Sequence, residues 1–274
     1  MLAVVSLYIV IQFCYSTVRR DQNMCSEQYT TDKNLQARIN LHDKYSVNKQ
    51  GFGNWIYSHY SITPEMRILE LGCGNGSLWP ERIHALPERC ELILSDSSPG
   101  MLDAAKRRVG EDIHLTYRQI NIMDIPYEID SMDVVIANLM LYHVPDIDCA
   151  LAEVRRVLKP GGIFYSATYG ENSIMSWLND VFSGFEVDIH MNTAFTLQNG
   201  SEMLTKHFHM VDRFDYPDAF EITNTDDLVN YVLSMTSMAN LSKLPREIIV
   251  EVLDSKRING VIHIPKEYGM FVSR

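Results

Sequence analysis

The sequence predicts an α/β fold in which helices cover both faces of a doubly wound, mainly parallel sheet, with an additional helical cap. Four short runs of residues are apolar on both faces, as strands inside a parallel sheet are. They are residues 68–71, 92–95, 133–137 and 163–167. Helical segments separate these runs, and a glycine-rich turn directly follows the first of them. Such alternation favours right-handed crossovers and a doubly wound sheet.

Start and stop signals delimit two of the helices. Ser98 is a suitable N-cap for a helix that begins at Pro99 and ends at Gly110. Asp146 is likewise expected to cap a helix that ends before the Lys-Pro-Gly-Gly sequence at 159–162. Both segments carry apolar residues at helical spacing, so each helix is expected to pack one face on the sheet.

Composition narrows the class of protein. The 274 residues include 24 basic and 35 acidic side chains, which gives a net charge of −11, and 46% of the residues are hydrophobic. This content excludes a disordered chain, and the negative charge argues against nucleic-acid binding, which normally needs a basic surface. The five cysteines include no Cys-x-x-Cys pair, so we interpret them as reduced thiols of a cytoplasmic protein and expect no metal site.

The first 18 residues are uncharged and mostly apolar, and two arginines follow them. This stretch is near the lower length limit for a membrane-spanning helix and lacks the basic start of a secretory signal. Residues 1–23 are therefore either a membrane anchor or an extension upstream of a natural start at Met24, and we favour the second interpretation. In both cases residues 24–274 are expected to form a single domain.

The turn after the first strand reads Glu70-Leu71-Gly72-Cys73-Gly74-Asn75-Gly76. Its alternating glycines let the backbone turn tightly and approach a ligand closely, at the carboxyl ends of the strands where doubly wound sheets bind ligands. A dinucleotide-binding turn would need a glycine at position 77, which is Ser77. The carboxylate of Glu70 instead suits a ligand that carries an ammonium group.

Polar residues at the ends of the other strands add to this site. Asp96 ends the second strand, where a carboxylate can accept hydrogen bonds from both hydroxyls of a ribose. Asp124 follows the third strand and can accept a hydrogen bond from an adenine amino group, and Asn138 ends the fourth. Together these residues provide a partner for an ammonium group, a partner for a diol and an acceptor for an amine, and no phosphate site is evident. This combination predicts S-adenosylmethionine as the ligand.

The stretch from residue 68 to residue 168 resembles the class I S-adenosylmethionine-dependent methyltransferases. Within them it is most similar to the small-molecule (methyltransferase type 11) group, which includes the ubiquinone and menaquinone biosynthesis methyltransferases. The matching sequences are ILELGCGNG (68–76), LSDSSPGML (94–102), NIMDIPY (121–127), SMDVVIANLMLYHVPD (131–146) and LKPGG (158–162). The resemblance implies a Rossmann-like, doubly wound, seven-stranded sheet with an antiparallel last strand, and residues 261–264 and 269–272 suit a hairpin at its end.

The resemblance also implies which residues contact the cofactor. The glycine turn would hold the methionine part, Asp96 the ribose, Asp124 the adenine and Asn138 the sulfonium end. The full expected set is Glu70, Gly72, Cys73, Gly74, Gly76, Asp96, Ser97, Met101, Asp124, Ile125, Asn138, Leu139 and His143.

Several of these residues also have structural explanations. Glu70 could pair with a backbone amide at a helix start, and Asp96 could cap the turn after it. Cys73 is expected to fill space, because no nearby histidine would activate its thiol. His143 is interpreted as a structural or cofactor-contacting residue, with general base as the alternative role. The catalytic residue is otherwise unassigned, with Tyr45 as the other candidate.

The acceptor pocket must come from segments outside the strand motifs. Residues 29–60 resemble the covering helices of the same methyltransferase group, and Tyr45, Phe52 or Trp55 could either face the sulfonium or pack on the sheet. Residues 171–258 contain amphipathic stretches, which predict a mobile helical lid inserted between the fifth strand and the last pair.

We therefore expect an enzyme that transfers a methyl group from S-adenosylmethionine to a small molecule at O, N, S or C. Catalysis can come largely from holding the acceptor in line with the methyl group, so no catalytic base has to be evident. Methylation of nucleic acid or protein is the alternative activity; the acidic charge and the Asn138-Leu139-Met140 strand end argue against nucleic acid. An alternative of another class is a protein that binds the cofactor without turnover, as a sensor or partner subunit.

Overall fold

The computed structural model describes residues 40–187, 189, 191–234 and 241–274. Within them, seven strands form one sheet in the order β3-β2-β1-β4-β5-β7-β6. The strands are β1 (Arg67–Leu71), β2 (Glu91–Asp96), β3 (Leu115–Gln119), β4 (Met132–Asn138), β5 (Leu158–Tyr169), β6 (Val211–Ile222) and β7 (Ile262–Ser273). Strands β1 to β5 are parallel, and β7 is antiparallel to both β5 and β6. The predicted fold class is confirmed.

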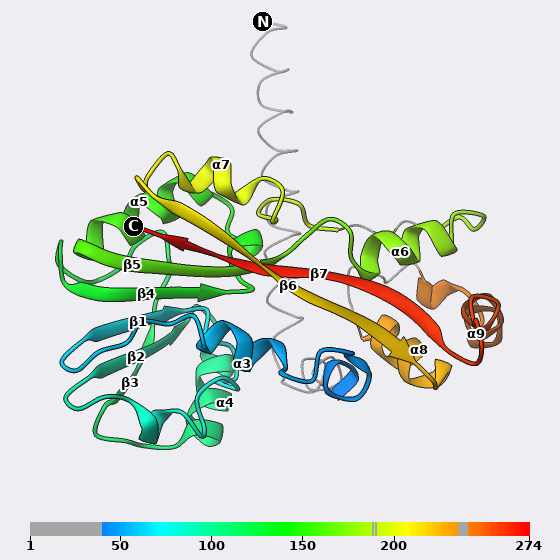
Figure 1. Cartoon of the computed structure of the whole chain (residues 1–274), viewed down its shortest axis with the longest axis horizontal. Helices are drawn as coiled ribbons and strands as arrows, with labels where there is room; N and C mark the ends of the chain where they lie inside the picture. Colours follow the sequence, from blue (N-terminus) through cyan, green and yellow to red (C-terminus); the bar gives the residue numbers. More distant parts are fainter. Residues whose placement is uncertain (1–39, 188, 190, 235–240) are drawn as a thin grey trace, which may run out of the picture.

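The helices lie on both faces of the sheet and around one end of β6 and β7 (Figure 1). They are α3 (Phe52–Tyr57), α4 (Pro99–Val109), α5 (Ile147–Val157), α6 (Ile174–Val181), α7 (Gly200–Leu204), α8 (Thr225–Leu233) and α9 (Arg246–Asp254). Both predicted N-caps are confirmed. The Ser98 side chain accepts a hydrogen bond from the amide of Met101, and the Asp146 side chain accepts one from the amide of Cys149.

Alternate residues of the parallel strands face two separate apolar cores, as the pleat of a buried strand requires. On one face, strand residues such as Leu69 and Val135 join apolar residues of α5 and α7. On the other face, Ile68 and Val134 join Trp55 of α3. Because both faces are covered, the strands are apolar on both sides and lack a polar alternation.

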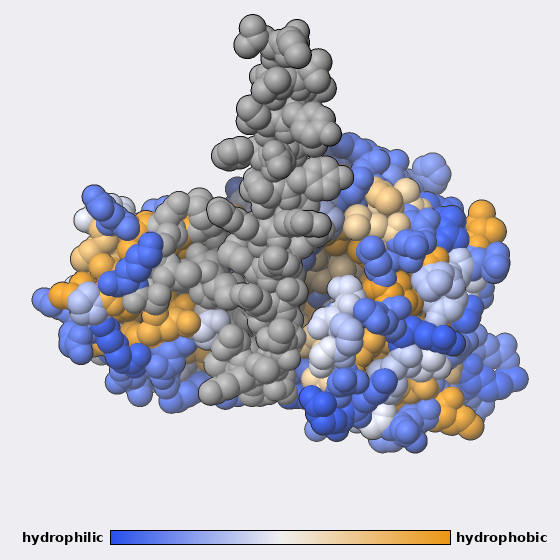
Figure 2. Space-filling view, turned by 180° about the vertical axis from the view of Figure 1, so that it is seen from behind, coloured by the Kyte–Doolittle hydropathy of each residue, from blue (hydrophilic) through white to orange (hydrophobic). Residues whose placement is uncertain are grey.

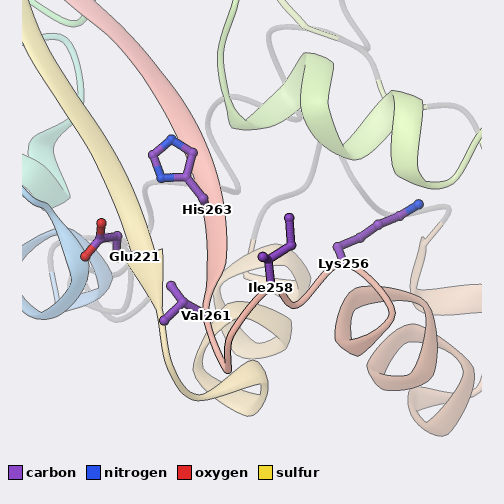
Figure 3. A pocket seen from close by; sticks show the side chains of 5 residues that line it. All are labelled: Glu221, Lys256, Ile258, Val261 and His263. Atoms are coloured by element: carbon purple, nitrogen blue, oxygen red, sulfur yellow. The ribbon is translucent and has the colours of Figure 1, made fainter.

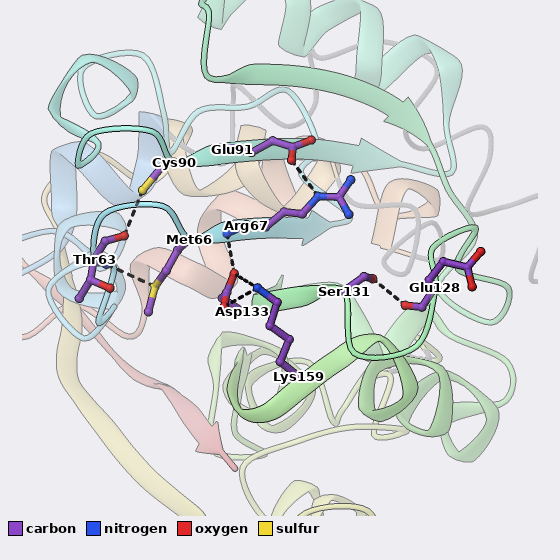
Figure 4. Close-up of polar contacts among 9 residues, drawn as sticks. All are labelled: Thr63, Met66, Arg67, Cys90, Glu91, Glu128, Ser131, Asp133 and Lys159. Carbon is purple, nitrogen blue, oxygen red and sulfur yellow. Dashed lines mark hydrogen bonds and ion pairs between the residues drawn. The ribbon is translucent and has the colours of Figure 1, made fainter.

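Asp133 connects the strands at the amino-terminal edge of the sheet. Its carboxylate accepts a hydrogen bond from the amide of Arg67 at 2.9 Å and pairs with Lys159 Nζ at 2.7 Å. Beside it, the Arg67 side chain pairs with Glu91 at 2.8 Å (Figure 4). This edge of the sheet therefore carries its basic side chains in ion pairs.

Strands β6 and β7 pair along their whole length, from Val211 with Ser273 to Ile222 with Ile262. Strand β5, however, pairs with β7 only as far as Tyr268. The far half of the β6–β7 pair, residues 217–222 and 262–267, therefore extends beyond the sheet as a two-stranded arm, visible in Figure 1.

The predicted terminal hairpin of residues 261–264 and 269–272 is wrong, because both segments belong to the single strand β7. The misleading residue is Pro265, which suggests a turn between them. In the arm, one side of β7 has no neighbouring strand, so a residue without an amide hydrogen does not interrupt the sheet. The antiparallel partner of β7 is β6, which the sequence analysis did not distinguish from the predicted lid.

A further apolar core surrounds the arm and is called the arm core here. Its buried residues come from one face of the arm, including Phe220 and Ile264, and from α6, α8 and α9; Leu41 and Tyr45 of the preceding segment complete it. Residues 171–258 thus contribute a strand as well as the predicted helices, and the mobility of this region stays a prediction.

The segment before α3 attaches to the arm. Residues 40–45 are helical, and the amide of Val47 then donates to the carbonyl of Ala219 at 2.9 Å.

Residues 1–39, which include the apolar stretch and the first part of the predicted covering helices, lie outside the described residues. Across the part of the chain that the structure describes, no helix has the length and apolar character needed to span a membrane. On the face drawn in Figure 2, hydrophobic residues are interspersed with hydrophilic ones.

Candidate functional site

The glycine turn after β1 adopts the conformation that its sequence predicts. Gly72, Gly74 and Gly76 all have positive φ angles, of 70°, 57° and 69°. A Cβ on Gly72 would lie 2.8 Å from Met140 Cβ, and one on Gly76 would lie 2.8 Å from Val109 Cγ2 in α4. A Cβ on Gly74 would meet no atom within 4 Å. Gly72 and Gly76 are therefore required by packing, whereas Gly74 borders open space that a ligand can approach.

Asp96 joins the turn to the end of the neighbouring strand. Its carboxylate accepts hydrogen bonds from the amide of Gly74 at 3.0 Å and from the amide of Ser98 at 2.8 Å. The structural explanation of Asp96 as a cap is thus correct, and a backbone hydrogen bond at Ser97 also acts on this carboxylate. A carboxylate has about four acceptor positions, so these amide bonds do not exclude hydroxyl partners. Burial raises the pKa of Asp96, while the amide bonds act in the opposite direction.

Glu70 is 4% exposed. Its carboxylate accepts hydrogen bonds from side chains and not from amides at a helix start. The indole Nε1 of Trp79 donates to its carboxylate at 2.5 Å, and Asn138 Nδ2 donates at 3.4 Å. Burial raises the pKa of Glu70 to about 7, against the lowering effect of these two hydrogen bonds. The ion pairs among the described residues include none to Glu70. A cationic ligand would therefore find an acidic group without a positive partner.

Asn138 connects Glu70 to the segment that precedes β1, because its Nδ2 also bonds the hydroxyl of Tyr60 at 2.8 Å. The other atom of this amide, Asn138 Oδ1, is buried and has no partner among the described residues, and neither has the side-chain amide of Asn75 in the glycine turn. Buried polar groups are normally hydrogen-bonded. These unpartnered atoms in and beside the turn fit a site that a polar ligand completes.

The sequence analysis did not predict Trp79 and Tyr60. Trp79 comes three residues after the glycine turn, and Tyr60 lies in the predicted covering segment. A signal for Trp79 was available, because a buried carboxylate such as Glu70 requires a donor, and an indole N–H is one of the few donors that can be buried with it. No sequence spacing links Tyr60 to Asn138.

The residues predicted for the adenine side take varied positions. Asp124 is exposed beside the end of β3, so its carboxylate is open to solvent. Ile125 is buried, and its amide already donates to Glu153 at 2.9 Å. Met101 is buried in the first turn of α4, and Ser97 is exposed. Asp124 therefore remains available for a ligand, while the amide of Ile125 does not.

The turn after β4 lies over the glycine turn. Leu139 has a φ of 53°, a left-handed conformation that is uncommon for leucine, and its amide donates to the carbonyl of Ala167 at 2.8 Å. This bend brings Met140 against Gly72. His143 follows in a short 3-10 helix, is exposed, and its ring centroid is 4.5 Å from that of Tyr142. Its role as a general base stays a prediction.

Tyr45 does not join the glycine turn. It is buried in the arm core, and its hydroxyl donates to Asp227 of α8 at 2.5 Å. Phe52 and Trp55 stack with ring centroids 5.7 Å apart, and both contact the ring of Tyr216. These contacts agree with packing as their role.

Cys73 is half-buried within the turn. Burial raises the pKa of its thiol, and the carboxylates of Glu70 and Asp96 raise it further. The neutral thiol is therefore the stable form, as expected of a residue that fills space. The described residues contain no group of His, Cys, Asp or Glu suited to hold a metal ion.

A cavity of about 350 Å³ lies at the far end of the arm, away from the glycine turn. It is lined by Glu221, Lys256, Ile258, Val261 and His263 (Figure 3). Glu221 and His263 are partners on β6 and β7, and the Lys256 side chain extends away from the other four. A smaller cavity of about 140 Å³ lies between α5 and the end of α7. Neither is lined by a residue of the predicted site.

The family comparison agrees with the site. Residues 69–166 match the family model described as a methyltransferase domain. This segment is therefore similar in sequence to methyltransferase domains. It contains β2, β3, β4 and most of β1 and β5, together with the glycine turn, Asp96 and Asn138, so the resemblance predicted from the sequence is confirmed for the part of the chain that forms the site.

Two curated relatives match this domain and its surroundings. The malonyl-[acyl-carrier protein] O-methyltransferase of Serratia marcescens is 28% identical over 159 residues, covering 57% of this chain and 58% of that protein. The ubiquinone/menaquinone biosynthesis C-methyltransferase of a Shewanella species is 29% identical over 125 residues, covering 44% and 50%. The match thus spans about half the length of these relatives.

Solved structures share the fold over most of this chain. Phosphoethanolamine N-methyltransferase 2 of Haemonchus contortus, in complex with S-adenosyl-L-methionine, superimposes with a TM-score of 0.55 at 18% identity, over 89% of this chain and 57% of that one. The [4+2]-cyclase SpnF gives a TM-score of 0.58 at 15% identity, over 91% and 95%. One fold therefore occurs in a methyltransferase and in a cyclase.

Proposed function

We propose that this chain binds S-adenosylmethionine at the carboxyl edge of the sheet and transfers its methyl group to a small-molecule acceptor. The observation that carries the proposal is the hydrogen bond between the Asp96 carboxylate and the Gly74 amide. It places a carboxylate at the end of β2 beside the open space over the glycine turn, within a methyltransferase domain.

The residues at this edge suit an adenosyl amino acid. Asp96 would accept hydrogen bonds from the ribose hydroxyls, and exposed Asp124 would accept one from the adenine amino group. Glu70 and the unpartnered Oδ1 of Asn138 would face the ammonium group of the methionine part. The absence of the dinucleotide glycine at Ser77 supports a nucleoside without a pyrophosphate.

When bound, S-adenosylmethionine supplies a methyl group on a positively charged sulfur. In the transfer, a lone pair of the acceptor forms the new bond to the methyl carbon. The carbon–sulfur bond breaks and leaves its electron pair on sulfur, and a proton carried by the acceptor atom goes to solvent or to a base. The chain contributes by fixing the two reactants in line, an effect that contributes up to roughly 7–11 kcal/mol in well-oriented reactions.

Methyl transfer is tested with purified protein, methyl-labelled S-adenosylmethionine and a metabolite extract. The proposal predicts label in a small-molecule product and formation of S-adenosylhomocysteine. Label in RNA, DNA or protein would instead support the alternative acceptors. Tight binding of S-adenosylmethionine without any label transfer would support a sensor or partner subunit and contradict the enzymatic part of the proposal.

A further inference from the structure

Basic residues are distributed unevenly about the sheet. Every strand of the parallel part is followed, at its carboxyl end, by a segment without lysine or arginine. These segments lie within residues 68–81, 90–105, 119–154 and 160–205, none of which contains either residue. The amino-terminal edge, by contrast, carries Arg67 and Lys159 (Figure 4). The asymmetry therefore separates the edge that binds ligands in such folds from the edge that does not.

The same segments contain carboxylates. Glu70, Asp96, Asp124 and Glu171 all lie at or just after the carboxyl end of a parallel strand. Apart from backbone amides, the hydrogen-bond partners of Glu70 and Asp96 among the described residues are the neutral groups of Trp79 and Asn138. This edge is therefore acidic and has few groups that could balance a further negative charge.

Two cations of β6 and β7, Lys266 and Arg213, are already paired. The side chain of Lys266 is 3% exposed and bonds the buried side chain of Asp218, as well as the Ser46 hydroxyl at 2.7 Å. Arg213 pairs with Asp215 at 2.7 Å, lies 3.8 Å from Glu267, and donates to the carbonyl of Leu197. Each is neutralised by a carboxylate and held by a further bond.

Among the other basic residues, Lys44, Lys49 and Arg82 make polar contacts, whereas Arg118 is exposed. Lys44 pairs with Asp227 at 2.6 Å. Arg82 donates to Asn54 and to the carbonyl of Leu78 and lies over the Tyr57 ring. Arg118 is exposed on the edge strand β3, on the adenine side of the predicted site. Lys49 is exposed and donates to the carbonyl of Ser46.

Aromatic rings occupy the ends of β4 and β5, where an acceptor would meet the methyl group. The ring of Tyr142 lies 4.5 Å from that of Tyr169 and 4.5 Å from that of His143. Asn192 fixes this group from the other side, because its backbone carbonyl accepts from the Tyr169 hydroxyl and its side chain donates to the carbonyl of Tyr142. Tyr142 and Tyr169 together form an aromatic wall.

We propose that the acceptor is a small molecule without phosphate or carboxylate groups, with an apolar or aromatic body that packs on the Tyr142 and Tyr169 wall. This inference rests on the proposed function. A phosphate or carboxylate brought to this edge would lose its hydration next to like charges and, apart from the sulfonium of the cofactor, would meet few unpaired cations among the described residues, which is costly. A neutral or amine-bearing molecule meets no such penalty, and aromatic faces attract cations.

Label transfer followed by anion exchange tests the class of acceptor. The chain is incubated with methyl-labelled S-adenosylmethionine and a metabolite extract, and the products are passed over a strong anion exchanger at neutral pH. The inference predicts that labelled product flows through. Labelled product retained on the resin and eluted by salt would overturn it. Matched acceptors make the comparison sharper: ethanolamine with phosphoethanolamine, and catechol with 3,4-dihydroxybenzoate, where any methylated anionic member counts against the inference.

A chemical probe of the site tests its electrostatic basis without needing the right acceptor. A Tyr142→Cys variant, in a chain whose Cys14, Cys25 and Cys149 are replaced by serine, is loaded with S-adenosylhomocysteine. It is then modified with trimethylammonium-ethyl or sulfonato-ethyl methanethiosulfonate in 0.15 M salt. The ratio of the cationic to the anionic reaction rate at position 142 is expected to be about tenfold higher than the same ratio for a free thiol. Screening at this ionic strength means that mainly the charges close to residue 142 act on the reagents.

The control is Met210→Cys in the same background. Residue 210 is 56% exposed and lies beside the Arg274–Asp212 ion pair, so the two reagents should react there in the ratio of a free thiol. Equal or reversed rates at position 142 would overturn the inference and would indicate a cation from residues outside those described. Failure to load S-adenosylhomocysteine, measured by calorimetry, would instead contradict the proposed function. The two outcomes are thus distinguishable.

Discussion

The parallel sheet and the arm reach stability in different ways. In the parallel sheet, β1 to β5 bury apolar residues on both faces, and the buried carboxylate of Glu70 is held by neutral donors. In the arm, a buried ion pair of Lys266 and Asp218 lies between the aromatic rings of Phe220 and Tyr268. The difference indicates that the sheet leaves a charge unbalanced at its ligand-binding edge, whereas the arm balances its own charges for structural purposes.

The largest effect is expected in the arm, from Lys266→Met. This change leaves Asp218 buried and unpaired, which typically costs about 3–5 kcal/mol. Burial lowers the pKa of Lys266, and its bond to Asp218 opposes that effect. Urea denaturation should show the loss, and the double variant Lys266→Met, Asp218→Leu should recover most of it.

Lys44→Met is the matched control, because Lys44 also pairs with an aspartate, Asp227 of α8, but is exposed. An exposed ion pair contributes about 0–1 kcal/mol, so the control should change the free energy of unfolding very little. If both lysine variants had equal effects, burial of the Lys266 pair would not be the stabilising feature.

The next effect concerns Glu70 and pH. Its pKa in the folded protein is about 7, above its ordinary value of 4.5. The protonated carboxyl therefore favours the folded state below pH 4.5, and this contribution is lost as pH rises through 7. At about 1.4 kcal/mol for each pKa unit, the wild type should lose up to about 3 kcal/mol relative to Glu70→Gln between pH 4.5 and pH 8.

Guanidinium denaturation of both proteins across this pH range measures the difference. A constant difference in free energy of unfolding would mean that Glu70 keeps its ordinary pKa. S-adenosylmethionine should also bind the wild type more tightly above pH 7 than below pH 6, because its ammonium group pairs with the ionised carboxylate, while Glu70→Gln should lack this dependence.

The glycine turn should distinguish packing from ligand approach. Gly72→Ala places a Cβ 2.8 Å from Met140 and strains a positive φ, so we expect a loss of about 2 kcal/mol or more in thermal unfolding. Gly74→Ala meets no atom within 4 Å and should lose only about 1 kcal/mol. Its larger effect should be on cofactor affinity, because the added methyl occupies the open space. Equal cofactor affinities for Gly74→Ala and wild type would place the ligand elsewhere.

The smallest effect is expected for Tyr60→Phe. The variant removes one hydrogen bond to Asn138, about 1 kcal/mol, and leaves the ring in place against that of Tyr165. Because Asn138 also bonds Glu70, cofactor affinity should fall by roughly fivefold, in proportion to that energy. An affinity equal to that of the wild type would show that the Asn138 amide is oriented without Tyr60.

Local signals explain why the parallel sheet was predictable. The caps at Ser98 and Asp146, the apolar runs and the glycine turn each act within a few residues, and the structure confirms them. Asp96 was found because parallel strands end at a common edge, which brings its carboxylate to Gly74.

The arm and the partners of Glu70 depend on contacts between distant segments. Strand β6 can be recognised only after β7 is known to continue through Pro265. The buried ion pair likewise joins residues 218 and 266, which are far apart in the sequence. Tyr60 reaches Asn138 across 78 positions of the sequence. Sequence spacing carries no record of such contacts, so the acceptor side of the molecule required the three-dimensional structure.

The central claim is that the carboxyl edge of the sheet binds S-adenosylmethionine through Asp96, and calorimetric titration of four protein–ligand pairs tests it most directly. The wild type should bind S-adenosylmethionine more tightly than NAD. Asp96→Ala should bind S-adenosylmethionine at least about a hundredfold more weakly, since two hydrogen bonds to a charged acceptor are lost. Asp103→Ala, which removes an exposed carboxylate from α4, should bind as the wild type does. Equal affinity of the Asp96 variant and the wild type, or of S-adenosylmethionine and NAD, would contradict the account.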